Sequence, residues 1–252
     1  MFQEQRREKI LELLRENGSC RVQELSVLFK VSEPTIRQDL EALEKTHSIT
    51  RQHGGAFIAD FSSFTGKLTL EHMEHMEEKR RIGEKAAEFI KSGDSIILDS
   101  GSTLTELAKC IVNRKNLNII TPAINITLIL GTEPTNHIML TGGELKVPTL
   151  SVTGEKAAAV FKDIYVEKLF LATGGFSLAA GLTYPGISDI PLKQAMINSA
   201  KTVFLLADSS KIEKIYFASL NCLQKINYLV TDDNISPDYV KSLKDLGITV
   251  IT

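Results

Sequence analysis

The sequence has 252 residues, 43% of them hydrophobic and 24% charged, which is the composition of an ordinary globular protein. No run approaches the ~18 consecutive apolar residues of a membrane helix, and the charged start, MFQEQRREKILELL, lacks the apolar core of a signal peptide. The cysteines, Cys20, Cys110 and Cys222, are isolated, which favours a reducing cytoplasm and gives no metal-ligand spacing. The formal net charge of −2 provides no general attraction to nucleic acid.

Residues 4–57 show the apolar spacing of three short helices followed by a hairpin. The first stripe comprises Ile10, Leu13 and Leu14 and ends at Asn17-Gly18, and the second comprises Val22, Leu25, Leu28 and Phe29. The third helix lies in VSEPTIRQDLEALEK. There Ser32 is placed to cap the helix, and Pro34 falls in the first turn, where its missing N–H costs nothing. Val31 and Ile36 have the spacing of a hydrophobic staple across the cap.

The third helix has two faces. Its apolar face comprises Ile36, Leu40 and Leu43, and its outward face comprises Pro34, Arg37, Gln38 and Glu41. Two short helices joined by a tight turn, the second carrying polar side chains such as Thr35 near its N-terminus, are typical of a helix-turn-helix. Arginine pairs well with guanine and glutamine with adenine, each pair contributing ~1–3 kcal/mol of base discrimination.

The segment SITRQHGGAF predicts a hairpin that places Arg51 and His53 as a wing against a phosphate backbone or minor groove. The charge of the region argues against DNA binding, because nine basic and nine acidic side chains lie between residues 4 and 57. A small helical cap with a solvated charged face is the alternative. A neutral domain must bind DNA through local placement of Arg6, Arg7, Arg37 and Arg51, and as an oligomer.

The stretch VSEPTIRQDLEALEKTHSITRQHGGA resembles the signature of the DeoR family of bacterial transcription regulators. The matching positions are Val31, Ser32, Thr35, Ile36, Arg37, Asp39, Leu40, Leu43, Glu44, Arg51, His53, Gly54, Gly55 and Ala56. One departure is Gln38, where the family usually carries a second arginine. The resemblance implies a winged helix-turn-helix, with DNA-binding residues Ser32, Pro34, Thr35, Arg37, Gln38, Arg51 and His53.

Residues 58–78 are predicted to form a linker, because ADFSSFTGK is small and polar and the following LEHMEHMEEKRR is charged. His72 and His75 lie three residues apart among glutamates, a spacing that suits one face of a helix. Without a cysteine or a second cluster, an exposed acidic helix is the more common outcome, so we predict no metal site.

From Ile82 onward, strand-like apolar runs alternate with helical patterns, which predicts a mainly parallel α/β sheet. The runs are SIILD, LNIIT, HIMLT, EKLFLA, TVFLLAD and INYLVTD. Ligands of such sheets bind beyond the carboxyl ends of the strands. Small and polar residues gather there, at Asp99 to Thr103, Thr121, Gly142-Gly143, Thr173-Gly174-Gly175 and Asp208 to Lys211.

The stretch ILDSGSTLTELAKC predicts a strand that turns through Ser100, Gly101, Ser102 and Thr103 into a helix. The first amides of such a helix lack partners within it, and the helix dipole favours an anion by about 0.3–2 kcal/mol. A phosphate or a carboxylate fits this position. An ordinary strand-to-helix loop with a serine or threonine cap is the alternative.

The DeoR-family resemblance continues at Lys79-Arg80-Arg81-Ile82, DSGST, Gly142-Gly143, Gly154, ADSSK and Thr231-Asp232. It implies a sensor domain similar in fold to ribose-5-phosphate isomerase that responds to a phosphorylated sugar. The implied effector-binding residues are Ser100, Gly101, Ser102, Thr103, Gly142, Gly143, Gly174, Gly175, Asp208 and Lys211. Lys79, Arg80 and Arg81 are implied to touch the effector or to transmit its signal.

Two of these assignments have plain structural alternatives. Asp208 suits a cap of the turn that follows it, and Lys79, Arg80 and Arg81 suit a solvated first helical turn. A third feature is a departure from the family: ITPAIN carries Pro122 where many relatives have a polar pair after the strand.

A sugar-phosphate isomerase needs a positioned carboxylate to move a proton between carbons. In the related isomerases acidic residues lie in the loop after the fourth strand, whereas here that loop, ATGGFSLAAGLTY, contains no acid. Asp189 follows later, but a lone carboxylate does not make a proton-transfer site. The loop therefore favours a sensor over an enzyme.

We predict an N-terminal winged helix-turn-helix over residues 1–57, a linker over 58–78, and a mainly parallel α/β effector domain over 79–252. The predicted function is that of a cytoplasmic, homo-oligomeric repressor of a carbohydrate catabolic operon. Its expected partners are double-stranded operator DNA and a sugar phosphate, with no cofactor and no membrane. The alternatives are a sugar-phosphate isomerase or hydrolase with an accessory N-terminal domain, and an activator or scaffold that binds a protein partner.

Overall fold

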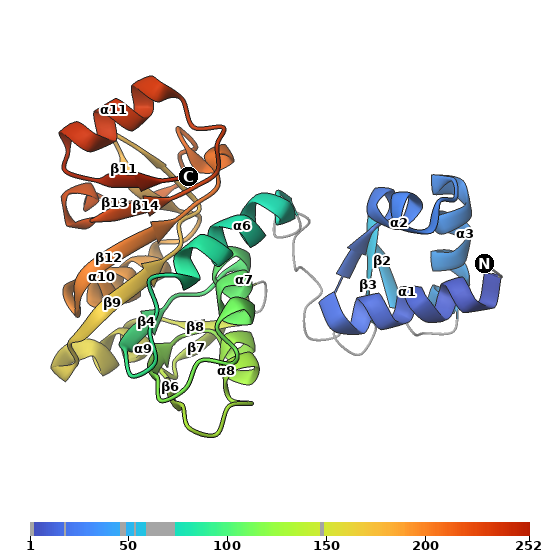
Figure 1. Cartoon of the computed structure of the whole chain (residues 1–252), viewed down its shortest axis with the longest axis horizontal. Coiled ribbons are helices and arrows are strands. Elements are labelled where there is room, and N and C mark those ends of the chain that lie inside the picture. Colours follow the sequence, from blue (N-terminus) through green and yellow to red (C-terminus); the bar gives the residue numbers. More distant parts are fainter. Residues whose placement is uncertain (1–2, 18, 46–48, 53, 59–73, 147–148) are drawn as a thin grey trace. The chain divides into compact units, whose positions relative to one another are not determined.

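The computed structural model describes residues 3–17, 19–45, 49–52, 54–58, 74–146 and 149–252 (Figure 1). The chain divides into two compact units, Met1–Met73 and Glu74–Thr252. The second unit begins with helix α6 (Met76–Ala87), so the domain start predicted at residue 79 falls inside that helix. Residues 76–78 already belong to the helix, and the charged pattern gives no local sign of where the helix begins.

The N-terminal unit contains the predicted three helices and hairpin. The helices are α1 (Gln3–Asn17), α2 (Val22–Phe29) and α3 (Glu33–Lys45), and the hairpin strands are β2 (Ile49–Gln52) and β3 (Gly55–Ile58). An additional strand that the sequence analysis did not predict, β1 (Ser19–Arg21), pairs with β3, so the sheet has the antiparallel order β1-β3-β2. This pairing joins positions almost 40 residues apart, for example Cys20 with Ala56.

The core of this unit confirms most of the predicted apolar positions. Ile10, Leu14, Val22, Leu25, Ile36, Leu40, Leu43 and Ile49 are buried together in it. Leu28 is the exception, because 59% of its surface is exposed. The predicted second stripe was therefore wrong at this position, since only Val22, Leu25 and Phe29 share the inward face of α2.

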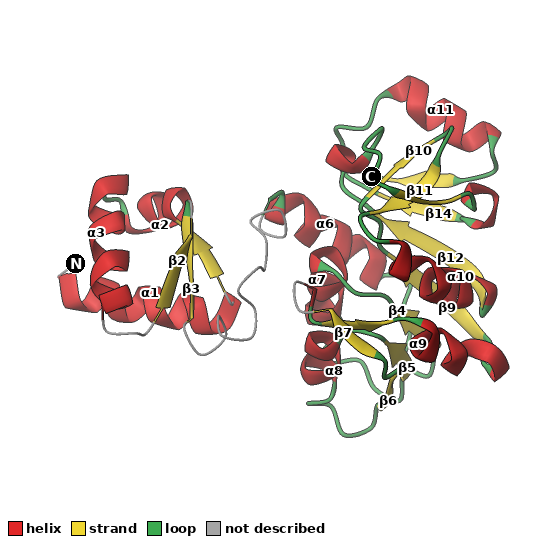
Figure 2. Cartoon of the chain, turned by 180° about the vertical axis from the view of Figure 1, so that it is seen from behind, coloured by secondary structure: helices red, strands yellow, loops and turns green. Residues whose placement is uncertain are grey.

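The C-terminal unit is built on a parallel seven-stranded sheet with helices on both faces (Figure 2). The strands lie in the order β15 (Thr249–Ile251), β14 (Tyr228–Val230), β12 (Ala200–Leu206), β9 (Val166–Leu171), β4 (Ser95–Leu98), β5 (Asn118–Thr121) and β6 (His137–Leu140). Adjacent strands are parallel throughout. All six predicted strand runs are present, and β15 joins them at one edge.

Alternating side chains of the strands divide between two apolar cores, one on each face of the sheet. In β4, Ile96 and Leu98 belong to one core and Ile97 to the other. The first core is completed by helices α6, α7 (Ser102–Cys110) and α8 (Ile124–Leu130). The second is completed by α9 (Glu155–Ala159), α10 (Ile190–Asn198) and α11 (Pro237–Asp245).

Two smaller antiparallel sheets follow strands of the main sheet. One contains β10 (Gly175–Ser177), β11 (Gly181–Tyr184) and β13 (Ala218–Leu220) in that order. The other pairs β7 (Glu144–Lys146) with β8 (Ser151–Thr153), and Val152 N donates to Pro122 O beside the carboxyl end of β5. Among the described residues, no helix combines the length and apolar character required to cross a membrane.

Candidate functional site

In the N-terminal unit, the outward face of α3 has the predicted exposure. Pro34, Arg37, Gln38 and Glu41 are exposed. Ser32 precedes the helix and its hydroxyl lies 2.9 Å from that of Thr35, while Arg37 Nη2 lies 3.1 Å from Glu33 Oε2. This solvated pair leaves Arg37 free to exchange Glu33 for a base or phosphate.

The turn before α3 is held closely. Lys30 ends α2 in the left-handed region with φ 52°, Val31 N donates to Ser26 O, and Ser26 Oγ donates to Val31 O at 2.6 Å. Glycine is the usual residue in this conformation. The turn therefore fixes the direction in which α3 leaves α2, as a helix-turn-helix requires.

Arg6 and Arg7 form a structural contact that the charge count did not predict. Both guanidinium groups donate through Nε to Asp39, at 2.5 and 3.1 Å, and the Asp39 carboxylate is fully buried. Arg6 is buried as well. They therefore join α1 to α3, and Arg37 and Arg51 are the remaining arginines of that proposed DNA-contacting set.

On the wing, Arg51 lies in β2, where its amide donates to Glu44 Oε1 at 3.0 Å and its Nη1 lies 3.8 Å from Glu44 Oε2. Glu44 thus positions Arg51 against the end of α3. His53, the other predicted wing residue, lies outside the described residues.

In the C-terminal unit, the predicted phosphate loop lies at the carboxyl end of β4, the central part of the sheet. Gly101 has φ 120° and precedes α7, a conformation that favours glycine. Thr105 N makes the first intrahelical bond, to Gly101 O, so the amides of Ser102, Thr103 and Leu104 point out of the helix start. Outward amides at a helix start are a geometry that suits an anion.

Asn125, at the start of α8, lies beside this helix start. Its Nδ2 donates to Thr105 Oγ1 at 2.7 Å, and its Oδ1 is buried with no hydrogen-bond partner among the described residues. A buried carbonyl oxygen without a partner is costly unless a ligand or water donates to it. Asn125 therefore supplies polarity where Pro122 departs from the family pattern.

Next to the loop lies a buried ion pair that the sequence analysis did not predict. Lys193 Nζ, from α10, lies 2.5 and 2.6 Å from the two oxygens of Asp99, and Ala172 N donates to Asp99 Oδ2 at 3.0 Å. Asp99 is completely buried, and Tyr184 lies beneath the pair, its ring centroid 5.5 Å from Lys193 Nζ. Burial and the Asp99 charge raise the pKa of Tyr184, so this phenol stays protonated.

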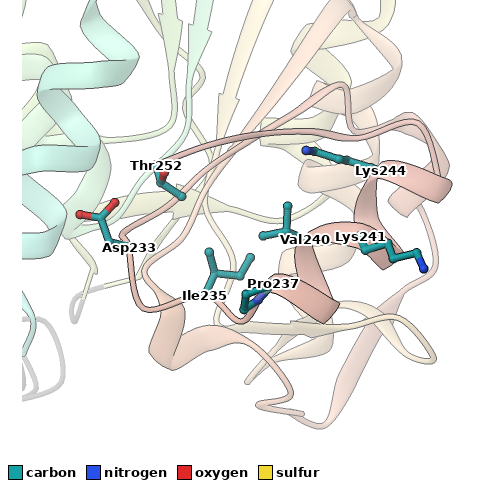
Figure 3. A pocket seen from close by; sticks show the side chains of 7 residues that line it. All are labelled: Asp233, Ile235, Pro237, Val240, Lys241, Lys244 and Thr252. Carbon is teal, nitrogen blue, oxygen red and sulfur yellow. The ribbon is translucent and has the colours of Figure 1, made fainter.

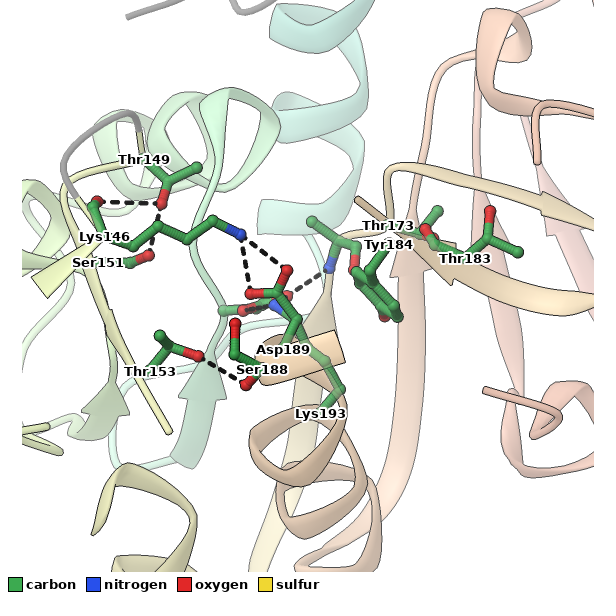
Figure 4. A network of polar contacts seen from close by, with 12 residues as sticks. Lys146, Thr149, Ser151, Thr153, Thr173, Thr183, Tyr184, Ser188, Asp189 and Lys193 are labelled. Atoms are coloured by element: carbon green, nitrogen blue, oxygen red, sulfur yellow. Dashed lines mark hydrogen bonds and ion pairs between the residues drawn. The ribbon is translucent and has the colours of Figure 1, made fainter. Parts of the chain in front are cut away.

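A second ion pair lies beside the first (Figure 4). Lys146 Nζ, from β7, lies 2.9 and 2.7 Å from the oxygens of Asp189, the residue before α10. Thr153 Oγ1 donates to Ser188 O at 3.0 Å, which ties the β7-β8 hairpin to the same turn. Asp189 is thus paired with Lys146, and Lys193 follows it by four residues on α10.

The predicted glycines after β9 and β6 have packing roles. A Cβ on Gly175 would lie 2.1 Å from Lys214 O, and one on Gly143 would lie 2.6 Å from Thr153 O. Gly174 approaches the Tyr216 ring in the same way. Gly142, with φ 68°, begins the turn that directs β7 back toward Asp189. Gly143, Gly174 and Gly175 thus permit close approach of neighbouring chain segments, whereas a Cβ on Gly142 would meet nothing within 4 Å.

Asp208 caps the turn that follows it, as its structural alternative predicted. Its Oδ1 accepts hydrogen bonds from the amide and hydroxyl of Ser210, within the short 3-10 helix Ser209–Lys211. Its Oδ2 is buried with no partner among the described residues. Lys211 belongs to this turn and is partly buried.

The structure brings the predicted effector residues only partly together. The loops after β4 and β9 are adjacent, with a Cβ on Gly101 lying 3.7 Å from that of Ala172. Asp208 follows β12, whereas Gly142 follows β6, four strands farther along the sheet, or about 19 Å at ~4.8 Å per strand. One small ligand does not span that separation directly. The β7-β8 hairpin, however, brings Lys146 back to Asp189 at the start of α10.

The basic triad at the start of α6 divides in two. Arg80 pairs with Glu77 and Glu84, and Arg81 pairs with Glu77, all on the exposed side. Lys79 is only 3% exposed and faces the packed side of α6. Arg80 and Arg81 thus match the solvated alternative, and Lys79 is the member of the triad that remains for an effector or signalling role.

A surface pocket of about 480 Å³ lies away from these groups, along α11 (Figure 3). Its lining comprises Asp233, Ile235, Pro237, Val240, Lys241, Lys244 and Thr252. It includes none of the predicted effector residues. Within the described part of the chain, no group of three or more histidine, cysteine, aspartate or glutamate side chains is arranged to hold a metal ion.

A winged helix-turn-helix unit and an α/β unit with an anion-binding geometry at its strand ends define a DNA-binding regulator with a sensor domain. The comparisons specify the family. Residues 6–61 match the DeoR-like helix-turn-helix domain and residues 74–233 match the DeoR C terminal sensor domain. The chain therefore belongs to the DeoR family of transcriptional regulators.

Full-length relatives support this assignment. The chain is 34% identical over 250 residues to the uncharacterized HTH-type transcriptional regulator YulB of Bacillus subtilis, covering 99% of this chain and 96% of that protein. It is 30% identical to the putative aga operon transcriptional repressor of Escherichia coli O157:H7, with 98% of this chain and 93% of that protein covered.

Among solved structures, ribose 5 phosphate isomerase A from Neisseria gonorrhoeae superposes at a TM-score of 0.39 and 16% identity, with 54% of this chain and 53% of that chain covered.

Proposed function

We propose that this chain is a repressor of a carbohydrate operon whose affinity for operator DNA changes when a phosphorylated sugar binds at the carboxyl ends of β4 and β9. The observation that carries the proposal is that one chain holds both an exposed recognition helix and a helix start at Gly101 whose first amides point outward, two residues after the Asp99–Lys193 pair. Relatives named as the putative aga operon repressor and as lactose phosphotransferase system repressors support the sugar assignment.

The ligand chemistry follows from the side chains. Outward amides of α7 suit the oxygens of a phosphate, and Lys146 adds a point charge. Asp189 and Asn125 supply hydrogen-bond acceptors for hydroxyl groups. Because the ligand must favour one DNA-binding arrangement over another, we expect a coupling of about 1–3 kcal/mol.

The isomerase alternative is disfavoured by the state of the carboxylates. Asp99 is completely buried and accepts from Lys193 and from Ala172 N, so it is closed to a ligand. Of this pair of carboxylates only Asp189 is left for proton transfer, and a lone carboxylate does not make a proton-transfer site. Turnover of a pentose or hexose phosphate by the pure protein would support the enzyme instead.

We further propose that the protein acts in the cytoplasm as a homo-oligomer. The helix-turn-helix unit carries no net charge, so it binds DNA through a few local phosphate contacts, and two units on adjacent half-sites double the number of these contacts.

The experiment measures binding of labelled DNA from the flanking promoter regions by fluorescence anisotropy, with and without a panel of sugar phosphates. We expect binding that weakens steeply with salt and that one phosphate ester alters while its free sugar does not. Ser102→Glu places a carboxylate in the phosphate position without harming the helix start, so it should abolish the ligand response and retain DNA binding. Thr132→Glu, exposed between α8 and β6, is the matched control. DNA binding that ignores every ligand would refute the sensor role.

A further inference from the structure

Lys146 and Lys193 are held very differently, although each forms an ion pair with an aspartate. The Lys193 side chain is 7% exposed and its carboxylate partner also accepts from Ala172 N. The Lys146 side chain is 31% exposed, and its contact with Asp189 is made across from β7 to the turn before α10. Lys146 is therefore the lysine that can leave its partner at lower cost.

The two pairs share one site. Asp189 and Lys193 are four residues apart at the start of α10, so they lie on the same side of the helix. Lys193 binds Asp99, and Asp99 lies two residues before Gly101. A ligand at the start of α7 is thus next to the Asp99 pair, with the Lys146 pair beside it in Figure 4.

The charges of the two pairs cancel, which limits what the site offers to an anion. Two lysines and two aspartates give no net formal charge. From these two pairs, a phosphate at the helix start gains a full cationic partner when a lysine turns from its carboxylate. That exchange leaves a nearly buried carboxylate, Asp189, which is costly unless it receives new hydrogen bonds.

We propose that Lys146 is an exchangeable lysine: bound phosphate takes Lys146 from Asp189, and Asp189 then accepts hydrogen bonds from hydroxyl or ammonium groups of the same ligand. The inference rests on the proposed function and deepens it. The site then selects ligands that carry a phosphate and donors on one skeleton. Inorganic phosphate binds weakly, because it leaves Asp189 without a partner.

The test is isothermal titration calorimetry on the full chain with two kinds of probe, inorganic phosphate and each sugar phosphate of the panel used for DNA binding. In Asp189→Asn, Lys146 has no carboxylate to leave, so affinity for inorganic phosphate should rise about tenfold while affinity for the sugar phosphate falls. Lys146→Met should weaken both probes by about 10- to 100-fold. Lys146→Arg, which keeps the charge, should recover much of this loss.

Lys156→Met, on the exposed side of α9, is the matched control and should bind both probes like the wild type. Thermal unfolding of each variant confirms that it is folded. Equal affinities of wild type, Lys146→Met and Asp189→Asn would overturn the inference and leave the proposed function standing. Weaker inorganic phosphate binding in Asp189→Asn would also overturn it, because Asp189 would then only position Lys146. If the wild type binds no sugar phosphate, the proposed function fails, and the inorganic phosphate comparison still decides whether Lys146 exchanges.

Discussion

Asp99 and Lys193 are separated by 94 residues in sequence, yet the Lys193 ammonium lies 2.5 and 2.6 Å from the two carboxylate oxygens in a buried position. The pair joins the end of β4 to α10 and thereby fixes the start of the loop that leads into α7. Each charge is buried because the other is present, so the two residues form a unit.

Lys193→Met should lower the free energy of unfolding of the C-terminal unit by about 3–5 kcal/mol, because it leaves Asp99 buried and unpaired. Chemical denaturation followed by circular dichroism measures the loss. The double variant Asp99→Asn with Lys193→Met should regain part of it, since no buried charge remains. A single variant as stable as the wild type would show that the pair contributes nothing to stability.

Asp39→Asn should destabilise the N-terminal unit by about 1.5–3 kcal/mol, the cost of weakening hydrogen bonds to a charged group. The substitution removes the charge that Arg6 and Arg7 share, so α1 and α3 lose their polar link. We expect the variant to lose operator binding and its N-terminal unit to unfold at a lower denaturant concentration. Unchanged unfolding of Asp39→Asn would contradict a stabilising role for the link between α1 and α3.

Arg37→Ala should weaken operator binding with little effect on stability. Its pair with Glu33 is exposed, so the free energy of unfolding should change by no more than about 0.5 kcal/mol. Operator affinity should fall by about 1–3 kcal/mol, with specificity relaxed at one base pair. Anisotropy titrations against single-base operator variants measure both. Unchanged affinity and specificity would exclude Arg37 from base contact.

The sequence predicted the elements that depend on neighbouring residues. The six apolar runs became six parallel strands, and the helical spacing of Ile36, Leu40 and Leu43 gave the buried face of α3. By contrast, β1 has three residues and exists only because β3 pairs with it from far along the chain. Its short run has no periodicity of its own.

The site was predicted less completely than the fold, for the same reason. The loop at Ser100 to Thr103 carries its own signal, because small residues between a strand and a helix favour an anion site. Lys146 and Lys193 carry no such signal, since each is defined by an aspartate 43 or 94 residues away. A sequence with no known contacts cannot reveal which lysine faces which carboxylate.

Asp232→Asn should show a pH-dependent effect on stability. Burial raises the pKa of Asp232, but hydrogen bonds from the Ser209 and Asn234 amides outweigh burial and lower it below the ordinary value of 3.8. A lowered pKa stabilises the folded state above about pH 3.8, and this contribution is lost as the pH falls through the folded value. The variant should therefore be about 1–3 kcal/mol less stable at pH 7, with the difference narrowing below pH 3.8. A difference that stays constant down to pH 3 would contradict the role of these hydrogen bonds.

Gly83→Ala should reduce the response to the effector by moving α6 against α7. A Cβ on Gly83 would lie 2.8 Å from Leu107 N and 2.9 Å from Glu106 C, so the two helices must separate. The added contact should cost about 1–3 kcal/mol of stability despite the better helix propensity of alanine. Because α7 begins at the proposed phosphate loop, sugar phosphate affinity should fall, while operator affinity without ligand should stay unchanged.

Glu84→Ala, the exposed neighbour of Gly83 on α6, is the control and should leave both affinities unaltered. Calorimetry for the ligand and anisotropy for the operator measure the two effects, and wild-type affinity for the sugar phosphate in Gly83→Ala would show that the helix contact does not position the site.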